Sequence, residues 1–169
     1  RARFLRHVLR IHHRLQGLVE AHTALITRTN PLAGDGNGFY ERFENPAITR
    51  DHVPLTWRYD LDEIDNPFLL ERLGVNSTFN PGAIEWNGKV RLVVRVEGAD
   101  RKSFFAFADS DNGVDNFRFA PRPLALPVTD DPETNVYDMR LTRHEDGWIY
   151  GLFCAERKDK TQPADPSAA

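Results

Sequence analysis

The chain has 169 residues, of which 40% are hydrophobic and 28% are charged, and its formal net charge is −3. This is the composition of one ordinary globular domain, long enough to bury a core. The longest apolar runs fall far short of the roughly 20 residues that span a bilayer, so the sequence argues against a membrane segment and predicts a cytoplasmic protein.

The first predicted element is a basic amphipathic helix over residues 1–29. Apolar side chains recur between Phe4 and Ile26 at the spacing of one helix face. Residues 1–30 hold six Arg against one acid, Glu20. Because this basic excess is confined to the helix, the pattern argues against nucleic-acid binding. The apolar stripe needs a partner, so we expect the helix to join subunits of a homo-oligomer or to pack on the body; a transit peptide is the alternative.

Residues 30–53 are predicted to form a connector loop, because Asn30-Pro31, Asn45-Pro46 and several glycines favour turns over regular structure. The pattern then changes to the period of two that is typical of strands. Six strand-like segments follow, at 83–86, 89–96, 103–108, 117–119, 136–143 and 148–155. Asn87-Gly88 and Glu145-Asp146-Gly147 supply the turns of two hairpins.

The strand-like segments predict an all-β fold for residues 54–169. Four consecutive antiparallel strands would make one blade of a β-propeller, and the last hairpin would begin a second blade. A β-sandwich is the alternative. Since a blade needs roughly 40 residues, the chain holds about one and a half blades and cannot close a ring alone. The absence of an initiator Met and an end just after a strand lead us to expect a fragment.

Polar residues gather at the ends of the predicted strands, within 58–62, 76–83 and 95–103. Asn, Asp, Glu and Arg offer paired donors and acceptors that hold adjacent sugar hydroxyls. The alternative is that these are ordinary turn residues. Asp138 is a stronger candidate for a functional residue, because it lies inside a strand between Tyr137 and Met139. Burial there would raise its pKa and favour a proton donor. A structural ion pair with Arg140 or Arg143 is the alternative.

Arg157 ends the second hairpin, where a fixed guanidinium would suit an oxyanion and a solvated side chain is the alternative. The single cysteine, Cys154, leaves no disulfide framework. His12 and His13 are adjacent on the predicted helix and point to different sides, so no metal site is predicted.

Long segments of the sequence resemble the mannosylglucose phosphorylase branch of the β-mannoside phosphorylases. They lie in the right order over most of residues 40–158, at 57–61, 76–83, 95–105, 112–119, 134–141 and 145–157. The resemblance implies a five-bladed β-propeller and an inverting phosphorolysis of a β-1,4-mannosidic bond to α-mannose 1-phosphate and glucose. Inorganic phosphate is then a co-substrate and no cofactor is expected. Because phosphate is already anionic, this reaction needs only one carboxyl group, the acid.

The resemblance also implies roles for individual residues. Asp138 matches the general acid, which passes its proton to the glycosidic oxygen through a hydroxyl of the mannosyl unit, and Arg157 matches a phosphate ligand. The residues implied to bind or support the mannoside are Asn80, Arg95, Glu97, Asp100, Arg101 and Asn135. The family's other phosphate ligands lie beyond residue 169, so we expect residues 1–169 alone to be inactive. Two alternatives stay open: a non-catalytic sugar-binding propeller, and a phosphate-independent β-mannoside hydrolase.

Overall fold

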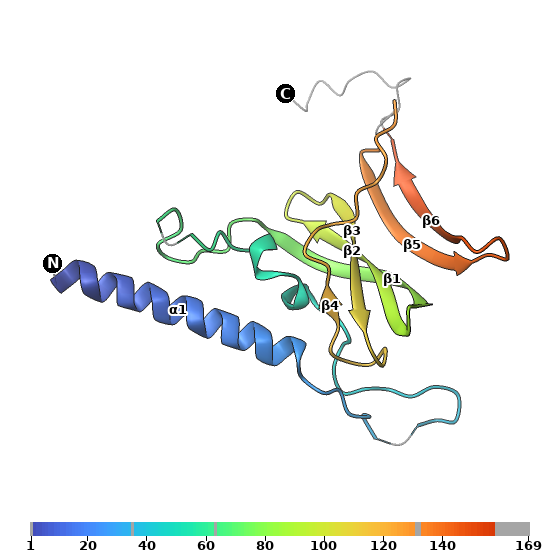
Figure 1. Ribbon diagram of the computed structural model, residues 1–169, viewed down its shortest axis with the longest axis horizontal. Helices are drawn as coiled ribbons and strands as arrows, with labels where there is room; N and C mark the ends of the chain where they lie inside the picture. The colour runs from blue at the N-terminus through green and yellow to red at the C-terminus, as the bar shows by residue number, and fades with distance from the viewer. Residues whose placement is uncertain (1, 35, 63, 131–132, 158–169) are drawn as a thin grey trace.

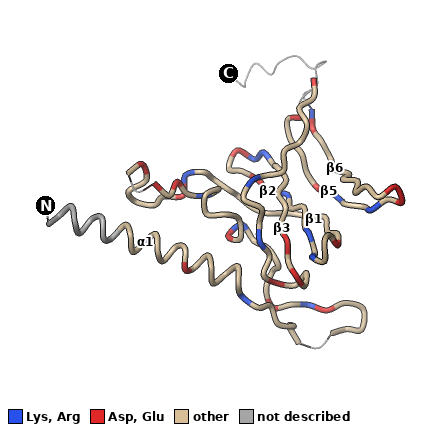
Figure 2. The backbone as a smooth tube through the Cα atoms, viewed as in Figure 1, with Lys and Arg blue, Asp and Glu red and all other residues tan. Residues whose placement is uncertain are grey.

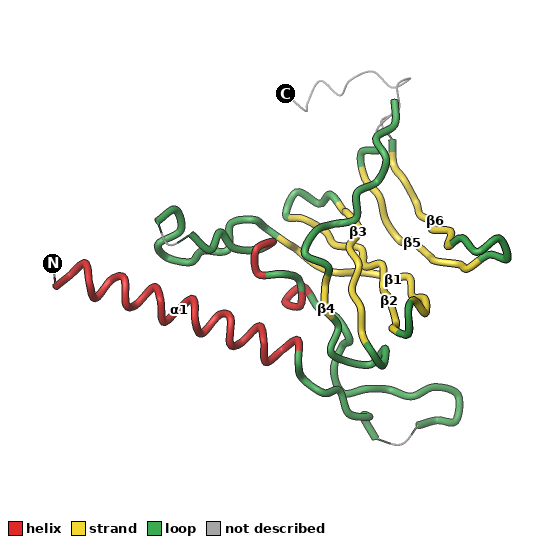
Figure 3. Tube along the Cα trace, viewed as in Figure 1, coloured by secondary structure: helices red, strands yellow, loops and turns green. Residues whose placement is uncertain are grey.

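The computed structural model describes residues 2–34, 36–62, 64–130 and 133–157, with side chains from residue 11 onward. One long helix precedes two antiparallel sheets (Figure 1), so the prediction of a mostly β chain with one helix is confirmed. Figure 3 shows the strands gathered away from the helix, with a long stretch of loop between. The elements are α1 (Ala2–Ile26), η1 (Arg50–His52), η2 (Leu55–Trp57), β1 (Val75–Trp86), β2 (Lys89–Gly98), β3 (Ser103–Ser110), β4 (Arg118–Phe119), β5 (Asn135–Arg143) and β6 (Ile149–Glu156).

The first sheet is a meander in the order β1-β2-β3-β4. Its first turn is Asn87-Gly88, with φ angles of 51° and 75°, the positive pair that a tight hairpin turn requires. Strand β1 begins at Val75, eight residues before the predicted start at Ala83. The polar stretch 76–83 therefore lies inside a strand, which keeps its pairing with β2 through a register shift between Phe79 and Gly82.

The second sheet is the hairpin of β5 and β6, with a register shift between Tyr137 and Arg140. One of its faces packs on the first sheet, as the ribbon in Figure 1 indicates. Val136 and Met139 of β5 form a buried cluster with Val93 and Phe105 of β2 and β3. The two sheets therefore share one core.

Strand β2 has buried side chains on both of its faces, since successive side chains of a strand point to opposite faces. Val93 faces the hairpin, whereas Val94 and Val96 face a second cluster that includes Val53. Val53 follows η1, so the connector covers the face of the sheet that the hairpin leaves open. Leu92, Val93, Val94 and Val96 of β2 are accordingly all buried.

Helix α1 contacts η1, at the end of the connector, and extends away from the sheets (Figure 1). His22 makes a hydrogen bond with the Val53 carbonyl at 3.0 Å, and Ile11 is buried. Arg118 donates to the carbonyl of Ile26, which fixes the end of the helix near β4. Acidic and basic residues are interspersed along the backbone of the sheets and their loops (Figure 2). Across the described part of the chain, no helix has the length and apolarity to cross a membrane.

Candidate active site

Two strand irregularities face each other at the junction of the sheets. Asn80 in β1 has a φ of 29° and Asp138 in β5 has a φ of 62°, and both lie within the register shifts. Non-glycine residues are uncommon in this left-handed region, and Asn and Asp are the types that tolerate it best. The Asn80 amide donates to the Asp138 carboxylate, with 3.1 Å between Nδ2 and Oδ1. The irregularities thus aim an amide and a carboxylate at each other across the two sheets.

Gly82 explains how the strands come this close. A Cβ atom at this position would lie 2.4 Å from the carbonyl oxygen of Met139, which is shorter than any contact that a real Cβ atom makes. Arg140 adds a contact beside it, because its Nη1 donates to the Asn80 carbonyl at 3.0 Å. Glycine at position 82 therefore allows β5 to lie directly on β1.

Arg95 of β2 approaches the same carboxylate from the first sheet. Its Nη1 lies 3.6 Å from Asp138 Oδ1, its Nη2 donates to Glu97 at 3.3 Å and its Nε donates to Ser103 Oγ at 2.9 Å. Arg95 and Glu97 share the face of β2 that is turned toward the hairpin, because they are two residues apart. Asp138 is therefore held by an amide and lies beside a cation, and both groups belong to the other sheet.

Glu97 is a buried carboxylate that organises its neighbours. It accepts hydrogen bonds from Asn76 at 2.7 Å, from Arg95 at 3.3 Å and from Arg101 at 3.4 Å. A buried charge needs such partners, because an unpaired one would be strongly destabilising. The Arg101 side chain is 80% exposed, so most of it extends from this network into solvent.

Asn135 and Asp100 belong to the same strand ends but have backbone roles. Asn135 Oδ1 accepts from the Ser103 backbone N–H at 2.8 Å, which ties the start of β5 to the start of β3. Asp100 Oδ1 accepts from the Lys102 backbone N–H at 3.0 Å, so its carboxylate is engaged by its own turn.

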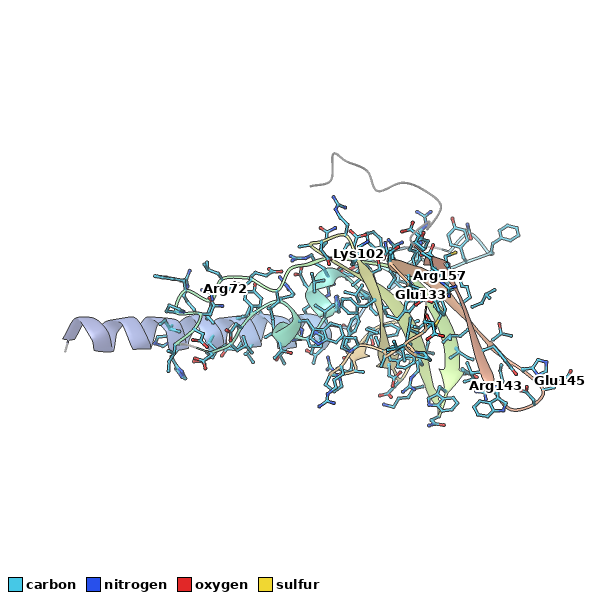
Figure 4. All side chains as sticks on the ribbon, turned by 90° about the horizontal axis from the view of Figure 1, so that it is seen from above. Arg72, Lys102, Glu133, Arg143, Glu145 and Arg157 are labelled. Carbon is cyan, nitrogen blue, oxygen red and sulfur yellow. The ribbon has the colours of Figure 1, made fainter. Side chains whose placement is uncertain are left out.

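Arg157 forms an ion pair with Glu133, with 3.1 Å between Nη2 and Oε1. Figure 4 shows both side chains near Lys102, at the ends of the strands opposite Arg143 and Glu145. The Arg157 side chain is half exposed. Arg157 is therefore paired with Glu133 and also open to solvent.

The prediction that Asp138 is buried against Tyr137 and Met139 was wrong. Its side chain is 36% exposed, because the strand irregularity turns it away from the core that Met139 enters. The alternative ion pair was also wrong. Arg140 donates to the carbonyls of Asn80 and Met139, and Arg143 donates to the carbonyl of Glu85 at 3.0 Å.

Sequence reasoning missed one contact beside the site. The Tyr137 hydroxyl donates to Glu156 Oε1 at 2.6 Å, and this hydrogen bond raises the pKa of Tyr137. Its only signal in the sequence is the place of Tyr137 directly before Asp138. Within the described residues, no three His, Cys, Asp or Glu side chains gather closely enough to hold a metal ion.

The class that fold and site define is a mostly β protein with one helix and with a polar site, centred on a carboxylate, where its two sheets meet. No protein-family model matches the chain. The chain is similar to a 4-O-β-D-mannosyl-D-glucose phosphorylase of Bacteroides fragilis, with 59% identity over 146 residues, or 86% of this chain. It spans 37% of the length of that relative. The similarity confirms the resemblance to the mannosylglucose phosphorylases that the sequence segments predicted.

Proposed function

We propose that residues 1–169 are part of an inverting β-mannoside phosphorylase. It cleaves mannosyl-glucose with inorganic phosphate and releases α-mannose 1-phosphate and glucose. The observation that carries this proposal is the Asp138 carboxylate, which is placed in a left-handed strand conformation and held by Asn80 and Arg95 of the other sheet. Strained backbone at a polar site is typical of a functional residue. The 59% identity to a mannosylglucose phosphorylase supports the substrate.

In this proposal Asp138 is the general acid. Its proton passes, through a hydroxyl of the mannosyl unit, to the glycosidic oxygen as the bond to the anomeric carbon breaks. A phosphate oxygen attacks that carbon from the opposite face, which inverts the configuration. Because phosphate arrives as an anion, no second carboxylate is needed as a base. The partial exposure of Asp138 supports this role, since the acid must reach the substrate.

Arg157 is the proposed phosphate ligand. Glu133 holds its guanidinium at the strand end, and a half-exposed, oriented guanidinium suits bidentate binding of an oxyanion. Arg101, Asn80 and Asp100 are the proposed ligands of the mannosyl unit. Glu97 and Asn135 support them, Glu97 by fixing Arg101 and Asn135 by joining the two sheets.

We also propose that the two sheets are the first blade and half of the second blade of a five-bladed β-propeller. In the domain division that goes with it, residues 1–29 form the helix, 30–53 the connector and 54–169 the first part of the propeller. Face-to-face packing of the hairpin on a four-stranded meander supports this arrangement. The outer face of β6 supports it too, because Tyr150 and Leu152 are exposed there and a third sheet would cover them.

Two further points belong to the proposal. Residues 1–169 alone are inactive, because the chain spans 37% of the length of the phosphorylase that it resembles. The complete protein is a cytoplasmic homo-oligomer joined through α1, whose Val19 is exposed. Deleting residues 1–29 should reduce the size of the assembly in light scattering, and an unchanged size would contradict this contact.

Replacing Asp138 with Asn in the complete protein that contains residues 1–169 tests the function. We expect turnover of mannosyl-glucose to be abolished while the affinity for the sugar is kept, because the amide keeps the shape but cannot supply the proton. A wild-type protein that binds the sugar but does not turn it over would favour a non-catalytic sugar-binding propeller. Release of mannose without phosphate would favour a hydrolase.

A further inference from the structure

Arg95 lies at the joint between the two sheets, and its side chain is only 19% exposed. Its guanidinium is 5.0 Å from the ring centroid of Phe79 in β1 and 5.0 Å from that of Tyr137 in β5. A cation held near the faces of two aromatic rings is attracted to both. The rings therefore restrict the position of the guanidinium.

Hydrogen bonds fix its orientation as well. Nε donates to Ser103 Oγ at 2.9 Å and Nη2 donates to Glu97 at 3.3 Å, so two of its three nitrogens are engaged by the first sheet. The third nitrogen, Nη1, lies 3.6 Å from Asp138 Oδ1. Because the guanidinium is planar and rigid, fixing two nitrogens also fixes the third.

Arg91 offers a comparison on the same face of the same strand. It too lies near two aromatic rings, those of Trp86 and Phe107. Its acid is Asp109, the residue directly opposite in β3, which accepts two hydrogen bonds at 2.8 and 2.7 Å. Arg91 thus completes an ion pair within one sheet, whereas Arg95 reaches a carboxylate of the other sheet.

We propose that Arg95 is a positioning residue for Asp138, an inference that rests on the proposed function. It holds the Asp138 carboxyl group at the place from which the proton passes toward the leaving oxygen. Arg95 acts through Asp138, whose position it fixes from within the joint, and it does not bind the sugar. Arg95 itself exchanges no proton: the proton leaves Asp138, the bond between the anomeric carbon and the glycosidic oxygen breaks, and phosphate forms the new bond.

The test is Arg95→Lys in the complete protein that contains residues 1–169. Lysine keeps the charge, but one ammonium group cannot serve Ser103, Glu97 and Asp138 together. We expect kcat for mannosyl-glucose to fall about 100-fold, with the KM values for sugar and phosphate within about threefold. With 4-nitrophenyl β-mannoside and phosphate the loss should be below about fivefold, because that leaving group needs little protonation.

Arg91→Lys is the matched control, and it should leave both rates within about twofold of the wild type. If Arg95→Lys does not fold, Ser103→Ala removes only the acceptor of Nε and should show the same substrate selectivity with a smaller loss. A rise in the KM for the sugar alone would make Arg95 a substrate ligand. Equal losses with both substrates would make it general structural support. Either result overturns the proposal. A wild-type protein without phosphorolysis would overturn the proposed function itself.

Discussion

Strands β2 and β6 are both rich in apolar residues, yet their burial is very different. Strand β2 lies between β1 and β3 and has a core on each face, so Val93 and Val94 are both buried. Strand β6 pairs with β5, and its Leu152 is 79% exposed while Phe153 packs on the shared core. Alternation along a strand decides which residues share a face, and only the elements packed on that face decide whether it is buried.

The largest loss of stability is expected from a change at Phe105, in the core that β2 faces and β6 only borders. Its side chain is 1% exposed and meets Phe153 edge to face at 5.5 Å across the two sheets. Phe105→Ala should lower the free energy of unfolding by about 3–5 kcal/mol, because it leaves a cavity where the sheets join. Urea unfolding measures this change, and a loss below about 1 kcal/mol would contradict a shared core.

Leu152→Ala is the matched change on the outer face. In residues 1–169 alone it should change the free energy of unfolding by less than about 0.5 kcal/mol, since the side chain is exposed. In the complete protein the proposed propeller predicts a loss of about 2 kcal/mol, because a further sheet would bury it. The same small effect in both would contradict the propeller.

The contact of the two sheets at Gly82 comes next in size. Gly82→Ala places a methyl group 2.4 Å from the Met139 carbonyl, and backbone must move to admit it. We expect a loss of about 1–3 kcal/mol in the free energy of unfolding and a loss of kcat, because Asp138 moves with β5. Gly17→Ala is the control: nothing lies within 4 Å of its added methyl group, so it should stabilise the helix slightly. Equal effects of the two changes would break the comparison.

A smaller loss of stability is expected from breaking the ion pair between Arg91 of β2 and Asp109 of β3. The hydrogen bonds from Arg91, offset by partial burial, hold the pKa of Asp109 below its ordinary value of 3.8. A lowered pKa stabilises the fold at pH values above the ordinary one, and this contribution is lost as the pH falls below it. Asp109→Asn should therefore cost about 1 kcal/mol at pH 7 and nearly nothing at pH 2. A cost independent of pH would show that the charge is not the cause.

The smallest effect concerns His52 in the connector. Burial, reinforced by the charges of Arg28 and His22, lowers the pKa of His52 from its ordinary value of 6.5. The neutral ring accepts a hydrogen bond from the Thr49 backbone N–H at 3.0 Å. Because the unfolded chain binds the proton more readily, stability is full above pH 6.5 and declines as the pH falls below it. His52→Gln should reduce the difference between the free energies of unfolding measured at pH 7.5 and at pH 5.5. The same difference as in the wild type would contradict a contribution from His52.

The local part of the fold was predictable from the sequence. Asn87-Gly88 forms a turn with positive φ angles, as this pair does in hairpins. Alternation also placed the other strands close to their observed bounds. The early start of β1 at Val75 was missed, because Asn80 and Pro81 interrupt the alternation and only the contact of Gly82 with β5 explains why the strand continues.

The site was predictable in its residues but not in its contacts. Asn80, Arg95 and Asp138 were singled out, and the structure brings them together. The sequence suggested ion pairs of Asp138 with arginines of its own strand, because the sequence alone indicates only pairs that are close along the chain. The actual neighbours are 58 residues away for Asn80 and in the other sheet for Arg95, so only the packing of the sheets shows them.

The central claim is that the Asp138 site serves phosphorolysis. The most direct test incubates the complete protein that contains residues 1–169 with mannosyl-glucose, with and without inorganic phosphate, and follows the products by NMR. We predict α-mannose 1-phosphate and glucose with phosphate present, and no product without it. Release of free mannose in the absence of phosphate, or a β-configured phosphate product, would contradict the account.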